Sequence, residues 1–292
     1  MAPCHKDVKM SHIIHLRQRI KTVAMIQKTT HAMRLTSMST HAHLNKKKVF
    51  LEQYSSELEK VLESVKHDVT PVSVETENAP TPCFLTIVVG SQKGLCGSFN
   101  IRLLRFFEEH KDNQAGNLIA IGKKIIELVE PQHHLHYSFP AFTATNFFAL
   151  SAELCQHILG NTGYTKLTIY SNYPQSFFIQ RPIVTVIDVP QPLPEAYAIR
   201  HPKASTTESS SGYLYDQPAP EILATLDRFY LKIRVEEILF NSLIAEHAAR
   251  FISMDASSTN AAKILEEMKR DYNKLRQASI TRELMDLIGG FA

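Results

Sequence analysis

A glycine-rich turn is the first stretch of this 292-residue chain that could carry chemistry. It runs from Gly90 to Asn100 with the sequence GSQKGLCGSFN, between an apolar run and a helical stretch. Backbone N–H groups at such a turn could bind a phosphate. The spacing fits neither common phosphate motif, because Lys93 precedes Gly94, no Gly-Lys-Ser/Thr follows, and the interval from Gly90 to Gly94 is too long for GxGxxG. We therefore predict a structural turn, with nucleotide binding as the minority alternative.

The histidines and cysteines lack the spacing of metal ligands or catalytic groups. The clustered histidines are His41, His43, His133, His134 and His136. A metal site would need i, i+4 spacing on a helix or nearby Cys and carboxylates, so these are predicted to be surface histidines. The cysteines are Cys4, Cys83, Cys96 and Cys155. Without a CxxC pair they are typical of small buried hydrophobes in a reducing compartment. No catalytic residue, cofactor or metal site is predicted.

Positive charge is concentrated near the start of the chain, although the net charge is only +3. Nine Lys or Arg residues lie between Lys9 and Lys48, with no Asp or Glu among them. Such a face favours nucleic acid, anionic lipid or an acidic protein surface; the alternative is a solvated basic helix. No apolar run reaches the length of a membrane span, and the first residues lack the apolar core of a signal peptide. We expect a soluble or peripheral protein.

The glycines and prolines divide the chain into three parts. Neither occurs from Cys4 to Thr70 or from Glu221 to Ile288, and nearly all lie between Pro71 and Pro220. Because both residues disfavour helix interiors, the two ends are predicted to be long helices. A helix over 221–288 would measure about 100 Å and needs a partner. The predicted domains are an N-terminal coiled-coil helix at 1–70, an α/β globular domain at 71–219 and a C-terminal coiled-coil helix at 220–292.

Heptad patterns indicate how the two helices pair. The C-terminal pattern is Ala261, Leu265, Met268, Tyr272 and Leu275. The N-terminal pattern is apolar at Ile13, Leu16, Ile20 and Val23, polar at Gln27, Thr30, Arg34, Ser37 and His41, and apolar again at Leu44, Leu51, Leu58, Leu62 and Val65. A simple two-stranded coil would not tolerate so polar a centre. Either the register shifts, with Ile26, Met33 and Met38 facing inward, or the helix leaves its partner.

The middle of the chain reads as an α/β unit that opens with strand, glycine turn and helix. Predicted strands are 83–89, 117–121, 166–170 and 179–189, with a short edge strand at 213–215. Predicted helices are 101–111, 123–129 and 147–159, with a linker at 70–82 and a loop at 190–211. The fold class is α/β in an α+β arrangement: a long antiparallel coiled coil plus a Rossmann-like body.

Several motifs along almost the whole chain resemble the gamma subunit of F-type ATP synthases, the central rotor shaft. They are LRQRIKTV at 16–23, QKTTHAMRL at 27–35, GLCGSFN at 94–100, YLYD at 213–216, EHAARFISMDASSTNA at 246–261, and YNKLRQASITREL at 272–284 followed by Gly289-Gly290. The resemblance implies a non-catalytic rotor that couples proton-driven rotation to conformational change in a ring of α and β subunits. It also implies the epsilon subunit and the membrane-embedded c-ring as partners, no cofactor, and a peripheral place on the cytoplasmic face of the bacterial inner membrane. The absence of a long organelle presequence favours a bacterial or a processed protein.

The resemblance also assigns contact residues. Positions matching the family's contacts with β subunits are Met33, Arg276, Gln277 and Thr281, with Glu283 nearby, and Tyr213 and Tyr215 match the foot. The chain departs from the family pattern at Gln92, usually Asp, at His31, usually Lys, and in the segment after Met254. Two rival hypotheses remain: a nucleic-acid-binding protein with a basic coiled-coil arm, and an α/β enzyme with helical dimerisation arms.

Overall fold

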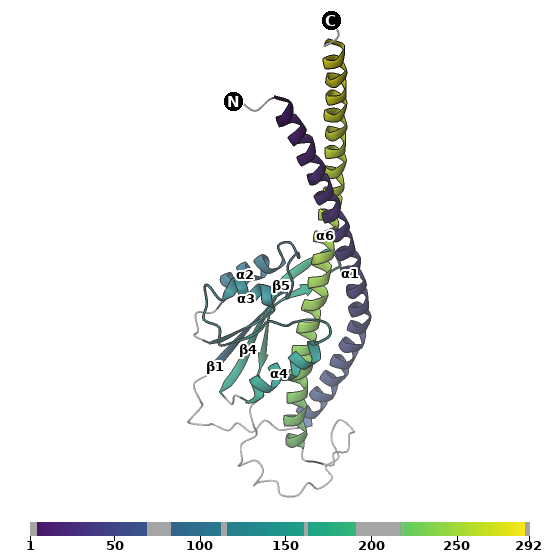
Figure 1. The fold of residues 1–292 in the computed structure, drawn as a ribbon. Helices are drawn as coiled ribbons and strands as arrows, with labels where there is room; N and C mark the ends of the chain where they lie inside the picture. Colours follow the sequence, from purple (N-terminus) through teal and green to yellow (C-terminus); the bar gives the residue numbers. More distant parts are fainter. Residues whose placement is uncertain are drawn as a thin grey trace. The chain divides into compact units, whose positions relative to one another are not determined.

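The computed structural model describes residues 5–68, 83–111, 116–160, 163–190, 217 and 219–289. The chain divides into two compact units. Residues 1–38 and 250–292 form the first, here named the coil unit, and residues 39–249 form the second, the body unit. Helix α1 (His5–Asp68) and helix α6 (Ala219–Gly289) each contribute residues to both units (Figure 1). Both long helices were therefore predicted to within a few residues at each described end.

Polar residues inside α1 remain compatible with the helix because they bond to its own backbone. The hydroxyls of Thr22, Thr29 and Thr36 each donate to the carbonyl oxygen four residues earlier, at 3.0 to 3.2 Å. A hydroxyl that is bonded in this way does not draw the backbone into a non-helical hydrogen bond. At the start of α6, Pro220 and Glu221 lie in the first turn, where a missing N–H costs nothing and an acidic side chain faces the positive helix end.

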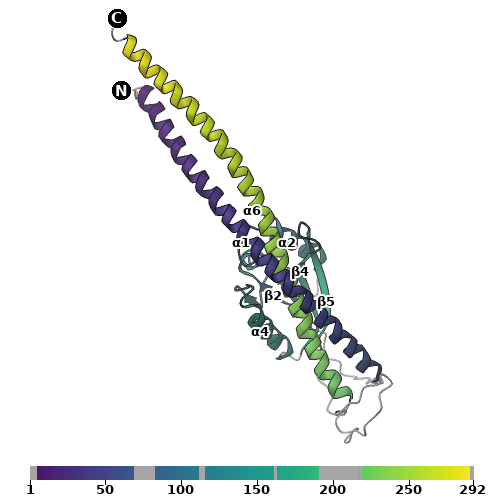
Figure 2. The same ribbon diagram turned by 90° about the vertical axis from the view of Figure 1, so that its right-hand side faces the viewer.

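Figure 2 shows the coil unit as an antiparallel helix pair. Its inner faces follow the predicted heptads. On α6, Ala261 and Leu265 are buried, and Met268, Tyr272 and Leu275 are half-buried. On α1, the inner positions are half-buried at Ile13, Leu16, Ile20, Val23, Gln27, Thr30 and Arg34, and buried at Ser37. We call these inner positions the seam. The seam continues through its polar residues without a break.

The alternative in which the register shifts is wrong for this unit. Ile26 and Met38 are 49% and 44% exposed, so they do not face inward. Met33 is half-buried, beside Arg34. The helix also does not leave its partner at this point, since Arg34 bonds to Asp255 of α6. Our expectation failed because it counted apolar residues alone, whereas here small side chains and an ion pair occupy the interface.

The body unit contains a five-stranded sheet in the order β3-β2-β1-β4-β5. The strands are β1 (Cys83–Val89), β2 (Asn117–Ile121), β3 (Tyr137–Phe139), β4 (Tyr164–Pro174) and β5 (Gln180–Asp188). All neighbouring pairs are parallel except β4–β5, which is antiparallel. The four strands predicted within the described residues are present. Strand β3 was not predicted, because three residues carry too little pattern to be recognised.

Helices cover both faces of this sheet. Helices α2 (Phe99–His110) and α3 (Lys123–Val129) pack on one face, against Val88 of β1. Helix α4 (Phe147–Gly160) and the body-unit parts of α1 and α6 pack on the other, against Leu85 and Ile87. Strand β1 is therefore buried on both sides, as its continuous apolar sequence predicted. The predicted linker at 70–82, the edge strand at 213–215 and all but the first residue of the loop at 190–211 lie outside the described residues.

Candidate partner-contact site

The glycine turn is a packed junction in the body unit. The N–H of Gly90 donates to the Ile121 carbonyl at 2.9 Å, and the amide of Asn100 bonds to both the N–H and the hydroxyl of Ser91, at 3.0 and 2.7 Å. A Cβ at Gly90 would lie 2.4 Å from the Cβ of Ile125. Glycine is therefore required there by the close approach of α3.

The second half of the turn packs against α6. Leu95 and Gly97 both have positive φ values, 66° and 59°, so the backbone reverses tightly. This reversal places Cys96 and Phe99 in a buried cluster with Ala245 and Ala249. These contacts give the turn the structural role that its spacing predicted.

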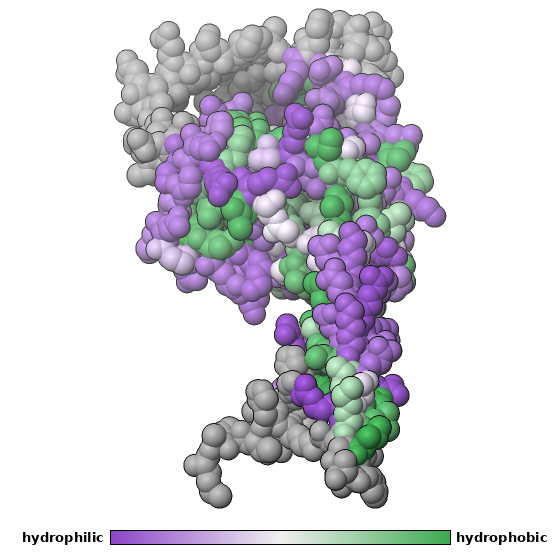
Figure 3. Space-filling model, turned by 90° about the horizontal axis from the view of Figure 1, so that it is seen from above, coloured by the Kyte–Doolittle hydropathy of each residue, from purple (hydrophilic) through white to green (hydrophobic). Residues whose placement is uncertain are grey.

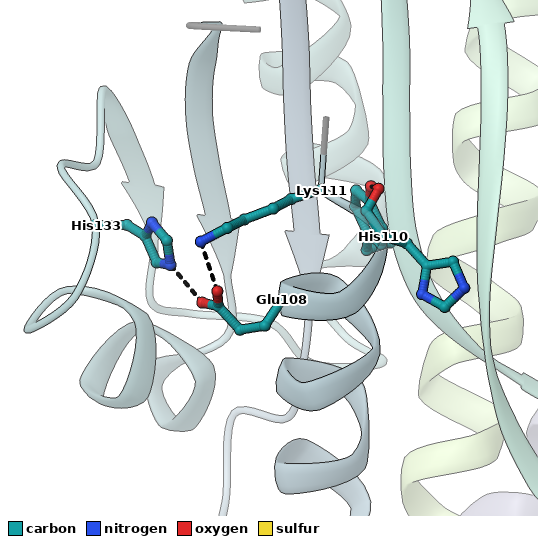
Figure 4. Close-up of polar contacts among 5 residues, drawn as sticks. Glu108, His110, Lys111 and His133 are labelled. Atoms are coloured by element: carbon teal, nitrogen blue, oxygen red, sulfur yellow. Dashed lines mark hydrogen bonds and ion pairs between the residues drawn. The ribbon is translucent and has the colours of Figure 1, made fainter. Parts of the chain in front are cut away.

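A group of charged side chains in the body unit joins α2 to the segment after α3. Glu108 lies 2.5 Å from both the Lys111 ammonium and the Nε2 of His133. Figure 4 shows His133 and Lys111 both directed at Glu108, whereas His110 points away from it. The hydrogen bond from Lys111, with a further one from His133, lowers the pKa of the Glu108 carboxyl. We call this arrangement the surface clasp.

The histidines correct one expectation. His41 is buried in the body unit, its ring in edge contact with Phe177 at 4.8 Å, and burial lowers its pKa. It is therefore not a surface histidine, because its ring packs against Phe177 inside the body unit. His43, His134 and His136 are exposed and His133 is half-buried. Across the described ranges, no three His, Cys, Asp or Glu side chains gather closely enough to hold a metal ion.

The side chains of two of the four cysteines, Cys96 and Cys155, can be placed, and both are buried. Burial raises the pKa of the Cys155 thiol to about 12, with Glu236 adding to the effect. A thiol of that pKa stays protonated and unreactive at neutral pH. The prediction of buried cysteines is confirmed for Cys96 and Cys155; the Cys4 and Cys83 side chains lie outside the described set.

The predicted contact residues of α6 are all exposed. They are Arg276, Gln277, Thr281 and Glu283. The Thr281 hydroxyl donates to the Gln277 carbonyl at 3.0 Å, and Glu283 accepts from the Ser279 hydroxyl at 3.2 Å. Within the described part of the chain, Arg276 has no hydrogen-bond or ion-pair partner.

Apolar side chains that the contact prediction missed lie along the same part of α6. They are Ile280, Leu284, Met285 and Ile288, which are between 44% and 73% exposed. Ile280, Leu284 and Ile288 are four residues apart, so they form one stripe. The i, i+4 spacing could have revealed this stripe, but the polar residues between its members obscured it. Figure 3 shows apolar areas among hydrophilic side chains on the face in view.

The other predicted contact residues lie elsewhere. Met33 is half-buried on α1 in the coil unit. Tyr213 and Tyr215 lie outside the described residues. No helix within the described ranges combines the length and apolar character needed to cross a membrane.

Comparison with known proteins identifies the family. A family model described as ATP synthase matches residues 12–292. The ATP synthase gamma chain of Geotalea daltonii is 25% identical over 96% of this chain and 98% of its own length, and that of Rickettsia akari is 27% identical over 96% and 99%.

Solved structures share the fold. One is from Euglena gracilis mitochondrial ATP synthase, resolved as OSCP/F1/c-ring, with a TM-score of 0.65, 14% identity, and coverage of 96% of this chain and 94% of that chain. Another is from the central stalk and c-ring of Tetrahymena thermophila mitochondrial ATP synthase, with a TM-score of 0.57, 20% identity, and coverage of 79% and 99%. The family model matches residues 12–292 and, with the gamma-chain relatives, shows that the chain belongs to the ATP synthase gamma-subunit family.

Proposed function

We propose that this chain is the central-stalk rotor subunit of a proton-translocating F-type ATP synthase. It couples ion-driven rotation to conformational change in the α/β catalytic ring. The observation that carries the proposal is the family match from residue 12 to 292, which includes both helices of the coil unit. The chain is a non-catalytic subunit, and the nucleotide chemistry takes place on the β subunits.

The physical basis of coupling is differential binding. A ligand shifts a conformational equilibrium only by the difference in its affinity for the two states. The surface of α6 is uneven in this sense, because an apolar stripe from Ile280 to Ile288 adjoins the charged groups of Arg276 and Glu283. As such a surface turns, each β subunit meets a different side of it. Each orientation then favours a different β conformation.

Individual residues can be assigned to this contact. Arg276 offers forked donors to carboxylates or carbonyls of the ring, with Gln277, Thr281 and Glu283 on the same exposed segment. Met33 would contact the ring from α1. We assign Tyr213 and Tyr215 to the foot, at the epsilon subunit and the c-ring.

The domain assignment and the location complete the proposal. The coiled-coil helices are residues 1–70 and 220–292, and residues 71–219 form the α/β domain. In a complex built on a c-ring, the subunit is peripheral to the membrane. We place it on the cytoplasmic face of the bacterial inner membrane.

Co-expression with α and β subunits from the same source tests the function. We expect a stable complex with three copies each of α and β and one of this chain, seen by native mass spectrometry, with ATPase activity. Failure to co-assemble would remove the proposal. None of the relatives or structures reported above is described as nucleic-acid-binding; binding to DNA or RNA that weakens steeply with salt would revive that alternative.

A matched pair of variants tests the assigned contact. Arg276→Ala should lower the ATPase activity of the assembled complex, because it removes donors that face the ring. Arg282→Ala is the control: Arg282 is also exposed but lies about 120° around the helix from Arg276. Equal losses in the two variants would show that general charge, and not a specific contact, is involved.

A further inference from the structure

An ion pair links the two helices of the coil unit. The Nη1 of Arg34 lies 2.6 Å from the Oδ1 of Asp255. The Nη2 of Arg34 lies 3.3 Å from the Nδ1 of His31, and its Nε is buried with no hydrogen-bond partner. Arg34 therefore occupies a seam position, and Asp255 balances its charge there. Losing Asp255 would leave a partly buried guanidinium uncompensated.

Most side chains around this pair are small or polar. On α1 the neighbouring seam positions are Gln27, Thr30 and Ser37, and on α6 the buried Met254 is followed by Ser257, Ser258 and Ala261. The Thr30 hydroxyl donates to the Ile26 carbonyl of its own helix at 2.9 Å, and that of Ser257 donates to Ser253 at 2.8 Å. These groups are satisfied within their own helices. The small side chains among them offer few shape constraints against sliding, so Met254 and the ion pair are the larger groups at this level of the seam.

A slip by one heptad would remove the ion pair. Such a slip displaces one helix by about 10 Å along the other. The residues seven positions from Asp255 are Ala248 and Ala262, and neither can pair with Arg34. In the observed antiparallel alignment, Arg34 lies level with Asp255. Val23 precedes Arg34 by 11 residues and Leu265 follows Asp255 by 10, so these two apolar residues are level to within one residue. The ion pair and the apolar half of the seam thus select the same alignment.

We infer that the Arg34–Asp255 pair sets the register of the coil unit. It is a positioning pair: it fixes where the last part of α6, with Arg276 to Glu283, stands along α1. A polar residue at a single seam position can specify register at some cost in stability, and this pair extends that rule to an interface that is polar over several turns.

Disulfide trapping in the full chain tests the inference. Val23→Cys with Leu265→Cys reports the observed register, and Val23→Cys with Tyr272→Cys reports a one-heptad slip. After mild oxidation, mass spectrometry of the cross-linked peptides gives the ratio of slipped to observed register. We expect Arg34→Ala or Asp255→Ala to raise that ratio about five-fold, the size appropriate to a partly exposed ion pair.

A charge-reversed variant and a control decide the interpretation. Arg34→Asp combined with Asp255→Arg should return the ratio toward that of the unaltered chain, which a general loss of stability would not do. Arg270→Ala is the control, because Arg270 pairs with Glu266 within α6. An unchanged ratio in both single variants, no rescue by the reversal, or an equal rise in the control would overturn the inference.

The consequence for coupling rests on the proposed function. In the complex in lipid vesicles, Arg34→Ala should lower the protons pumped per ATP hydrolysed, and the charge-reversed variant should restore this ratio. Trapping on the chain alone does not need the partners. Failure to assemble would therefore overturn the proposed function, whereas a failed trapping experiment would overturn the register inference.

Discussion

Different forces stabilise the coil unit and the body unit, each within itself. The body unit has a close-packed apolar core on both faces of its sheet, in which Leu103, Ile119 and Leu154 are fully buried. The seam of the coil unit is mostly half-buried and is polar over several turns of α1. Packing specifies a structure through volume, whereas a polar seam needs specific partners. The two units should therefore respond differently to the same kinds of substitution.

The largest effect is expected at the glycine turn of the body unit. In Gly90→Ala the new methyl group would meet the Cβ of Ile125 at 2.4 Å. Neither group can move freely, because both belong to a packed strand–helix junction, so we expect a loss of about 3 kcal/mol or more in the free energy of unfolding. Urea denaturation followed by circular dichroism measures it. Gly160→Ala is the control, since nothing lies within 4 Å of a Cβ there; equal losses would contradict the packing argument.

A second substitution tests the apolar core directly. Leu103→Ala on α2 removes a side chain that is 0% exposed and should cost about 3 kcal/mol through lost burial and a cavity. Ile101→Ala on the same helix removes a side chain that is 50% exposed and should cost less than about 1 kcal/mol. The difference between the two, measured in the same urea experiment, isolates packing from helix propensity. A difference near zero would mean that this core does not dominate the unit's stability.

The coil unit should behave in the opposite way. Gln27→Leu places an apolar side chain at a half-buried seam position and should stabilise the helix pair by about 1 kcal/mol. Hydrogen exchange of peptides from residues 13 to 37 should slow accordingly. Lys28→Leu, at an exposed position, is the matched control and should change exchange little. Faster exchange in Gln27→Leu would show that the amide makes a contact that leucine cannot replace.

Sequence patterns were sufficient where a single force dominates. Strand β2 and helix α3 were predicted with their observed bounds, because apolar runs between breakers mark them clearly. Strand β3 was not predicted because it has only three residues, and only its pairing with β2 identifies it as a strand. The heptad pattern predicts the seam correctly through Ser37, but both alternatives predicted for its polar centre, a register shift or separation of the helices, are wrong. Nothing local to Arg34 identifies Asp255, which lies 221 residues away, as its partner.

The contact residues could be proposed only in part. Arg276 to Glu283 were recognisable because an ordered motif surrounds them, and the apolar stripe from Ile280 became evident only when its exposure was known. The burial of His41 could not be foreseen from its histidine neighbours, because Phe177 comes from a distant hairpin. The exposure of a residue depends on which distant segment packs against it, and the local sequence around the residue does not identify that segment.

The smallest effect concerns the clasp on the body unit and its dependence on pH. The pKa of Glu108 is lowered in the folded protein, so its carboxylate contributes stability above its ordinary pKa of 4.5 and loses it as the pH falls through the lowered value. At pH 7, Glu108→Gln should cost less than about 1 kcal/mol, because the pair with Lys111 is partly exposed to water. The cost should shrink progressively below pH 4.5, as the unaltered carboxyl also becomes protonated. Urea denaturation at pH 7 and pH 3 measures both values, with the exposed Glu109→Gln as control. A cost that is the same at the two pH values would indicate that shape, and not charge, joins α2 to His133.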